Sequence, residues 1–366
     1  MKRKLIVFHP ALAPYRIDFF NALADRFTLH LVLLGRNLQE QAFDQKKLLP
    51  RLRCRVSYFL SGFVILGRYI RTGAILLVRR EHPEVVLTYE YSLITLSLVL
   101  YRRIARASFK LYTMTDDNLE LFRKCRGLRA AVRRAVLRHI DGAIVIDEAV
   151  KSAMREIAGR DTLDVVTVPI LYDESVFRKD EKKIFNQAAS WRSKNLKEGE
   201  KAIVFVGRLV AVKNLHWLVD VAISPIWPVS CRLFIVGEGS LVSDLREKAF
   251  TAGDARRVTF MGRKEGDALQ IYFAAADALV LCSVSETFGA VVSEALHWGA
   301  RVYVSNHVGA KVLIRPGVNG GVFSLDGGEE FCSYLRELAQ SGPAWREGRP
   351  SLVPIRLADA VSNFKP

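Results

Sequence analysis

The segment from Ala278 to Asn306 constrains the fold more than any other part of the chain. It begins with an apolar run, Ala278–Cys282, and continues through a short polar loop into a helix that starts at Phe288 and Gly289. A second apolar run, Arg301–Ser305, follows the helix. Strand, helix and strand in this order form a βαβ unit, which binds ligands at the carboxyl ends of its strands. The segment therefore predicts a parallel sheet with a ligand site where the helix begins.

Two carboxylates flank this helix start. Glu286 lies in the loop, and Glu294 lies on the helix eight residues later. The free N–H groups and the positive end of the helix dipole suit a phosphate. Carboxylates repel a phosphate but suit the hydroxyls of a sugar. The combination predicts a site for a sugar phosphate or a nucleotide sugar.

The same alternation of strand and helix patterns runs through all 366 residues, which is enough for two domains of ordinary size. Helices are expected at Ile17–Asp25, Leu93–Arg106 and Leu128–His139. The expected strands are Leu5–Phe8, Leu29–Leu34, Val85–Tyr89, Phe109–Met114, Gly142–Ile146 and Val165–Val168 in the first half, then Ala202–Val206, Cys231–Val236, Val258–Met261, Ala278–Cys282 and Arg301–Val304. This repetition predicts an α/β fold of two doubly wound, Rossmann-like domains with parallel sheets.

The boundary between the domains is expected in the polar segment Asp173–Lys201, which contains no apolar strand. Near the end of the chain, Ile355–Phe364 has the pattern of a short helix. We therefore expect an N-terminal domain over residues 1–175, a linker over 176–200, a C-terminal domain over 201–345 and a crossover segment over 346–366.

The pair Glu286 and Glu294 resembles the E-x7-E motif of retaining glycosyltransferases of family 4, which have the GT-B fold. Other segments similar to that family stand in the expected order, and the resemblance covers nearly the whole chain. They are VFVGRLVAVKNLHWLVDVA (Val204–Ala222), LFIVGEGSLVSDL (Leu233–Leu245), VTFMGRKEGDALQIYFAAAD (Val258–Asp277) and GVNGGVFSLDG (Gly317–Gly327). The resemblance implies two Rossmann-like domains facing a cleft, with the donor bound in the C-terminal domain and the acceptor in the N-terminal domain.

The opening segment His9–Leu23, HPALAPYRIDFFNAL, is similar to a Pro-Tyr-Arg opening in family members that build surface polysaccharides. The resemblance implies transfer of a sugar from a UDP- or GDP-linked donor to a glycan or a lipid-linked acceptor, in bacterial polysaccharide or lipopolysaccharide synthesis. In the family's proposed route, the acceptor attacks the same face that the diphosphate leaves, and the departing diphosphate takes the acceptor's proton.

The donor-binding candidates follow strands or begin helices. Arg208 and Lys213 come just after an expected strand, where residues line the crevice of such a sheet. An arginine fork and a compact lysine charge suit a diphosphate, although either alone would be an ordinary surface cation. The resemblance implies that this pair holds the diphosphate, that Glu294 binds the ribose, and that Glu286 contacts the donor sugar and stabilises positive charge at its anomeric carbon. It adds as candidates the amides of Phe288, Gly289, Ala290 and Val291, Gly239 in a V-G-E-G turn, and Arg263 near the base or ribose.

Two groups of polar residues follow strands of the N-terminal half. Asp116 and Asp117, in YTMTDDN, come after one strand, although a helix cap and turn would also explain them. After the first strand, His9-Pro10-Ala11 replaces the Gly-Gly pair of many family members. We take Asp116 and Glu286 as the catalytic candidates, and His9, Tyr15, Arg16 and Asp117 as candidates on the acceptor side.

The net charge of +16 is concentrated in the first half, because residues 1–180 carry +12 and the remaining residues +4. No nucleic-acid-binding motif accompanies the charge, so we expect an anionic membrane surface as the partner and no nucleic acid. Two apolar segments end in basic clusters: Phe59–Val78, before Arg79 and Arg80, and Leu93–Leu100, before Arg102, Arg103 and Arg106.

Phe59–Val78 is expected to form an amphipathic helix, either packed in the core or lying in the lipid interface. Arg68 and Arg71 near its middle argue against a membrane span. The five cysteines are scattered and form no C-x-x-C pair, which favours a reducing compartment. We expect a cytoplasmic protein that is peripheral on the inner face of the plasma membrane.

The sequence contains no D-x-D after an apolar strand, no H-E-x-x-H and no zinc spacing, so we expect no cofactor and metal-independent chemistry. Alternative functions are a nucleotide-sugar epimerase or NAD enzyme, and a non-catalytic sugar- or nucleotide-binding module. An NAD enzyme would need G-x-G-x-x-G after the first strand, and His9–Arg16 contains no glycine. A non-catalytic binding module is expected to have lost a key glutamate or cation. All four such residues are present here: Arg208, Lys213, Glu286 and Glu294.

Overall fold

The computed structural model describes residues 2–37, 43–65, 68–71, 73–251, 256–341 and 345–366. The chain divides into two compact units. Unit 1 comprises residues 1–173 and 355–366, and unit 2 comprises residues 174–354. Each unit has one parallel sheet covered by helices, so the prediction of two doubly wound α/β domains is confirmed.

The sheet of unit 1 has seven parallel strands in the order β3-β2-β1-β6-β7-β8-β9. Its central strands are almost entirely buried, which agrees with their continuous apolar sequences, because helices cover both faces of a parallel sheet. The strands are β1 (Lys4–His9), β2 (Thr28–Leu33), β3 (Arg55–Tyr58), β6 (Val85–Tyr89), β7 (Lys110–Met114), β8 (Gly142–Val145) and β9 (Asp164–Thr167).

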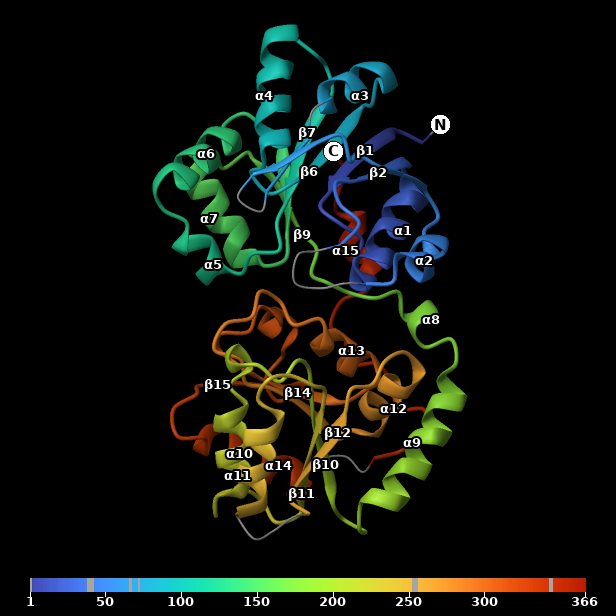
Figure 1. Cartoon of the computed structure of the whole chain (residues 1–366), viewed down its shortest axis with the longest axis vertical. Helices are drawn as coiled ribbons and strands as arrows, with labels where there is room; N and C mark the ends of the chain where they lie inside the picture. Colours follow the sequence, from blue (N-terminus) through green and yellow to red (C-terminus); the bar gives the residue numbers. More distant parts are fainter. Residues whose placement is uncertain (1, 38–42, 66–67, 72, 252–255, 342–344) are drawn as a thin grey trace. The chain divides into compact units, whose positions relative to one another are not determined.

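Helices cover this sheet in two layers. One hydrophobic cluster joins the sheet to α3, α4, α6 and α7, whereas α1 packs against α15 on the other side (Figure 1). The helices are α1 (Ile17–Arg26), α2 (Gln45–Leu48), α3 (Ala74–Glu81), α4 (Leu93–Ala105), α5 (Leu119–Lys124), α6 (Gly127–Leu137), α7 (Glu148–Ala158) and α15 (Leu357–Ser362), with 3-10 turns at Pro14–Arg16 and Leu49–Arg51.

The prediction of one amphipathic helix over Phe59–Val78 is wrong. The described part of this segment forms an antiparallel hairpin, β4 (Gly62–Ile65) and β5 (Arg68–Arg71), and only its end belongs to α3. Residues 66, 67 and 72 lie outside the described residues. Gly62 and Gly73 have φ angles of +126° and +91°, which a helix does not contain, and β-branched and aromatic residues between them favour a strand.

Unit 2 has a six-stranded parallel sheet in the order β12-β11-β10-β13-β14-β15. The strands are β10 (Lys201–Val206), β11 (Cys231–Val236), β12 (Val258–Gly262), β13 (Ala278–Leu281), β14 (Arg301–Ser305) and β15 (Gly320–Phe323). The helices are α8 (Glu174–Phe177), α9 (Glu181–Asn195), α10 (Leu215–Ile223), α11 (Val242–Thr251), α12 (Asp267–Ala275), α13 (Val291–His297) and α14 (Glu329–Ser341), with 3-10 turns at Ala211–Lys213 and Gly309–Leu313.

The polar segment expected to be a linker, residues 176–200, contains the 15-residue helix α9. This helix packs against α12 and belongs to unit 2. Its buried residues are Ile184, Phe185 and Ala188, which is a narrow apolar stripe on an otherwise polar helix. The low overall hydrophobicity of the segment is therefore compatible with a packed helix, which the sequence analysis did not predict.

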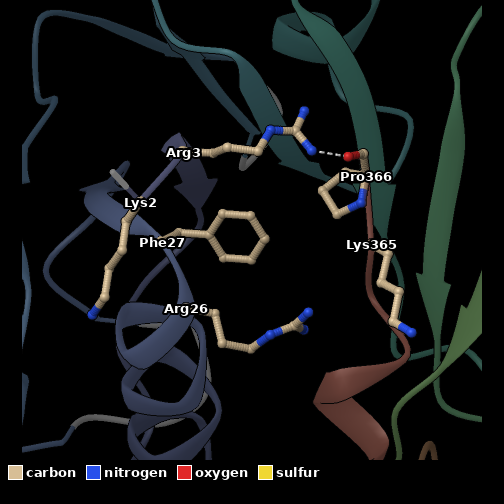
Figure 2. Close-up of a pocket in the computed structure, with 6 residues that line it drawn as sticks. All are labelled: Lys2, Arg3, Arg26, Phe27, Lys365 and Pro366. Carbon is tan, nitrogen blue, oxygen red and sulfur yellow. Dashed lines mark hydrogen bonds between the residues drawn. The ribbon is translucent and has the colours of Figure 1, made fainter.

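The last twelve residues return to unit 1, where α15 packs against α1. The Arg26 guanidinium donates to the carbonyl oxygens of Val361 and Phe364, and Arg3 donates to that of Pro366. Figure 2 shows these two arginines with Phe27 in a pocket at this junction. Unit 1 is thus assembled from both ends of the sequence.

Candidate functional site

The site in unit 2 lies where the strand order reverses. Strands β10 and β13 are neighbours, yet β11 and β12 continue the sheet from β10 in one direction, and β14 and β15 continue it from β13 in the other. The loops that follow β10 and β13 therefore diverge at the carboxyl edge of the sheet, which is where open α/β sheets bind their ligands. Arg208 and Lys213 follow β10, and Glu286 follows β13, so three of the predicted residues lie at this switch point.

Lys213 and Glu286 form an ion pair across the switch point. Their side chains are only 15% and 19% exposed, so the pair is largely removed from solvent. The Ser283 hydroxyl lies 3.4 Å from the same carboxylate oxygen of Glu286. Arg208 stands on the same loop as Lys213 and is exposed. The sheet thus presents a lysine ammonium and a glutamate carboxylate side by side, one suited to phosphate oxygens and the other to hydroxyls.

The loop that carries Lys213 is fastened to the end of β13. The Cys282 thiol donates to the carbonyl oxygen of Lys213 at 3.2 Å, and the Val284 amide donates to that of Val212 at 3.0 Å. Burial raises the pKa of the Cys282 thiol to about 12, which keeps its proton available for this bond. Cys282 is therefore a buried donor that holds the lysine loop in place.

Glycines at the switch point allow backbone segments to approach closely. A Cβ at Gly237 would overlap the carbonyl oxygen of Gly207, and a Cβ at Gly239 would overlap that of Leu209. The predicted donor residue Gly239 thus lets the loop after β11 pack on the loop after β10. A simple turn would not by itself require both glycines.

The helix after β13 begins later than predicted. Helix α13 starts at Val291, with Ala290 as its N-cap residue, so the prediction that it starts at Phe288 and Gly289 is wrong. Gly289 has a φ of +93°, outside the helical region, and the Phe288 side chain is buried. Ala290 and Val291 lie at the helix start as expected, and Glu294 lies half-buried on its first turn.

Arg263 lies apart from this group. It follows β12, the edge strand, which β11 separates from β10. Its guanidinium pairs with Glu265, and its side chain is 68% exposed. The structure therefore does not bring Arg263 together with Lys213 and Glu286, and its contact with the base or ribose stays a prediction.

Unit 1 has a switch point of its own, between β1 and β6. His9 ends β1 and Tyr89 ends β6, and their rings meet edge to face with centroids 4.9 Å apart. The His9 Nδ1 lies 2.8 Å from the carbonyl oxygen of Ala11, whereas its buried Nε2 has no hydrogen-bond partner among the described residues. Burial and the Arg16 charge lower the pKa of His9 to about 4, so the ring is neutral with Nε2 as an acceptor.

Beside this histidine, Arg16 and Asp116 form an ion pair. The Arg16 side chain is 3% exposed, and the Tyr89 hydroxyl donates to the other Asp116 oxygen at 3.5 Å. Burial and the charge of Asp116 raise the pKa of Tyr15 and of Asp117. The structure thus gathers these predicted acceptor-side residues in one cluster. The ion pair engages Asp116 with Arg16, and a catalytic role for Asp116 stays a prediction.

Tyr89 and Glu90 are residues at this switch point that sequence reasoning missed. Glu90 has a φ of +52°, which is unusual for a residue other than glycine. Its amide donates to the Met114 carbonyl at 2.7 Å, and its carbonyl accepts from the hydroxyls of Thr95 and Thr113. Backbone strain held in this way is typical of functional positions. The only signal in the sequence was the Tyr-Glu-Tyr triplet directly after an apolar strand.

No metal centre is evident in the described part of the chain. Among those residues, no three His, Cys, Asp or Glu side chains come together in a group that would hold a metal ion.

Residues 200–341, which lie within unit 2, match the family described as Glycosyl transferases group 1. The uncharacterized glycosyltransferase MJ1607 of Methanocaldococcus jannaschii is 30% identical over 189 residues, which are 46% of this chain and 48% of that protein. The chain spans about half or less of the length of the curated relatives it matches.

Solved structures resemble the chain over nearly its whole length. HepE of Anabaena, in complex with UDP, has a TM-score of 0.71 at 19% identity, covering 99% of this chain and 96% of that one. The lipopolysaccharide outer core galactosyltransferase WaaB has a TM-score of 0.71 at 16% identity, covering 98% of each chain. These likenesses establish the fold, which is GT-B.

Proposed function

We propose that this chain is a retaining glycosyltransferase that moves a sugar from a nucleotide-sugar donor to a glycan or a lipid-linked acceptor. The observation that supports it most is the Lys213–Glu286 pair at the switch point of unit 2. The pair lies inside the segment that matches Glycosyl transferases group 1. Both members of the E-x7-E pattern are present. Glu286 belongs to this pair, and Glu294 lies on the first turn of α13.

In this proposal each polar group of unit 2 has a part in the reaction. Lys213 and the exposed Arg208 neutralise the charge that develops on the leaving diphosphate, which is the largest electrostatic demand of the step. Glu286 binds donor-sugar hydroxyls and stabilises positive charge at the anomeric carbon. Glu294 holds the ribose, and the amides of Ala290 and Val291 meet the phosphate. The diphosphate accepts the acceptor's proton, so no separate base is required.

Unit 1 supplies the acceptor side. The neutral His9 offers an acceptor nitrogen, and Tyr89, Asp116 and Asp117 offer further oxygen atoms within the same cluster. Acceptors of hydrogen bonds suit the hydroxyls of a glycan. UDP and GDP are both candidate leaving groups, and the UDP bound to the structural relative HepE supports testing UDP-sugars first.

We further propose that the enzyme works at the inner face of a bacterial plasma membrane, in surface-polysaccharide or lipopolysaccharide synthesis. The excess positive charge of residues 1–180 supports an anionic surface as the partner. Within the described residues, none of the helices is both long enough and apolar enough to span a bilayer.

The experiment is a donor screen in buffer with EDTA. We expect the full chain to release UDP or GDP from its cognate sugar nucleotide, slowly by hydrolysis alone and faster with acceptor, and the product to keep the donor's anomeric configuration by NMR. An epimerase would convert the donor into its epimer, and a binding module would bind a nucleotide without turnover. Activity that disappears in EDTA and returns with Mg²⁺ or Mn²⁺ would contradict the metal-independent route.

Glu90→Gly tests the strained residue of the acceptor cluster. Glycine adopts a φ of +52° without cost, so the free energy of unfolding should stay within about 1 kcal/mol of wild type. We expect acceptor-dependent transfer to fall about tenfold or more while donor hydrolysis is unchanged. His82→Gly is the matched control, because His82 has a φ of +46° at the end of α3. Equal transfer rates in both variants would remove Glu90 from the acceptor site.

A further inference from the structure

Helix α4 carries an apolar stripe that faces away from the core of unit 1. Leu93, Leu100 and Ile104 are 55%, 52% and 83% exposed. Their spacings of seven and four residues put them on one side of the helix, because each spacing is close to a whole number of turns. The opposite side of α4 is buried through Ile94, Leu98 and Val99. The stripe is therefore a second apolar side of a helix whose first side already packs on the sheet.

The helices beside α4 add to this surface. Helix α4 packs against both α3 and α6, and each neighbour has one strongly exposed leucine, Leu76 at 67% and Leu128 at 81%. One hydrophobic cluster joins all three helices to the sheet of unit 1. We call the exposed side of these helices the α3–α4–α6 face. Large apolar side chains gathered on one face point to an interaction site.

The charges on the α3–α4–α6 face are almost all positive. The three helices contain seven arginines and a single acidic residue, Glu81. Glu81 is 6% exposed and is engaged by Lys4, His30, Arg55 and the exposed Arg80. Five of the arginines are exposed: Arg79, Arg80, Arg103, Arg129 and Arg134. The other two are used inside unit 1, since Arg102 pairs with Asp141 and Arg133 donates to the Phe122 carbonyl.

We propose that the α3–α4–α6 face docks on an anionic lipid bilayer, with Leu76, Leu100 and Ile104 dipping between headgroups and the exposed arginines binding lipid phosphates. This docking proposal rests on the membrane location given under Proposed function, and it names the surface that would contact the membrane. Apolar tips among arginines, with almost no exposed acid, are typical of helices that lie in the interface. A symmetric pair of copies meeting through this face would bring the two sets of arginines together, which charge repulsion opposes.

Flotation of the full chain with vesicles tests the proposal. The probes are vesicles of equal phosphatidylglycerol and phosphatidylethanolamine, compared with phosphatidylcholine vesicles. We expect binding only to the anionic vesicles, weakening with salt. Each arginine near the surface is worth about fivefold in binding, so Arg79→Ser/Arg80→Ser/Arg103→Ser should lower the partition coefficient about a hundredfold. Leu100→Gln/Ile104→Gln should lower it at least about tenfold. Arg102 is left intact because of its ion pair with Asp141.

Matched controls lie in unit 2. Lys179→Ser/Lys182→Ser/Lys194→Ser removes three exposed positive charges, and Val229→Gln removes an apolar side chain that is 87% exposed. Both should float like wild type. Calorimetric binding of UDP and GDP by every variant separates loss of docking from loss of the donor site.

Three outcomes would overturn the proposal. The first is equal flotation on neutral and anionic vesicles, or flotation on neither. The second is wild-type binding by both variants of the face, which would mean that another surface meets the lipid. The third is a dimer in light scattering that Leu100→Gln/Ile104→Gln dissociates, which would make the stripe a contact between copies. Each leaves the nucleotide-binding result, and hence the proposed reaction, to be judged separately.

Discussion

Replacing Lys213 with alanine is expected to weaken binding of the cognate nucleoside diphosphate roughly ten- to hundredfold. The lysine side chain is 15% exposed and already holds one carboxylate, so its ammonium is fixed in place for a second anion. Loss of a charge-assisted contact costs about 1.5–3 kcal/mol. Glu294→Ala should weaken binding to a similar extent, because the ribose hydroxyls lose their acceptor. Isothermal titration calorimetry with UDP and GDP measures both effects.

Glu286→Gln should separate binding from turnover. A glutamine keeps the shape of the side chain but loses the charge that we propose to stabilise the anomeric carbon, so we expect near-normal nucleotide affinity and a rate lower by about a hundredfold or more. Lys248→Ala is the control, since its ion pair with Asp220 lies on the helices and away from the strand ends. Unchanged affinity in both Lys213→Ala and Glu294→Ala would sink the assignment of the donor site.

Gly237→Ala is expected to damage both stability and the donor site. A Cβ at this position overlaps the carbonyl oxygen of Gly207, which is backbone and has no alternative rotamer, and the φ of +148° is unfavourable for alanine. Overpacking and backbone strain each cost about 1–3 kcal/mol, so the free energy of unfolding should fall by about 2–4 kcal/mol. The Arg208–Lys213 loop must shift, so nucleotide binding should also be lost.

Gly262→Ala provides the comparison for this variant. Gly262 also has a positive φ, +67°, but a Cβ there meets no atom within 4 Å. We expect Gly262→Ala to lower the free energy of unfolding by only about 1 kcal/mol and to leave nucleotide binding normal. Urea unfolding and calorimetry report the two properties. If both glycine variants lose the same stability and keep their affinity, the close approach of the two loops has no role.

The strands could be predicted from sequence because strands of a parallel sheet are buried on both faces and read as continuous apolar runs. The predicted bounds of β11, Cys231–Val236, match the structure, and β10 differs by one residue. The same reasoning failed where the prediction depended on the overall apolar content of a segment and not on the periodic spacing of its apolar residues. Phe59–Val78 is rich in apolar residues but is mainly a hairpin, and α9 is polar but is a packed helix.

The site was predictable as a set of residues but not as an arrangement. Alternating strands and helices do not specify the order of strands, so the switch points between β10 and β13 and between β1 and β6 could not be located in advance. The Lys213–Glu286 contact joins residues 73 positions apart, and Arg16 and Asp116 join residues 100 positions apart. These pairings depend on the three-dimensional fold, as does the left-handed backbone of Glu90.

The return of residues 355–366 to unit 1 decides how the protein can be divided. Unit 2 is one continuous stretch, so it is the natural fragment for testing whether this domain binds nucleotides alone. A fragment that stops at Asp173 would lack α15, and Arg26 would lose the carbonyls of Val361 and Phe364. A free-standing unit 1 therefore calls for a redesigned gene in which residues 355–366 are joined by a short linker or supplied as a separate peptide.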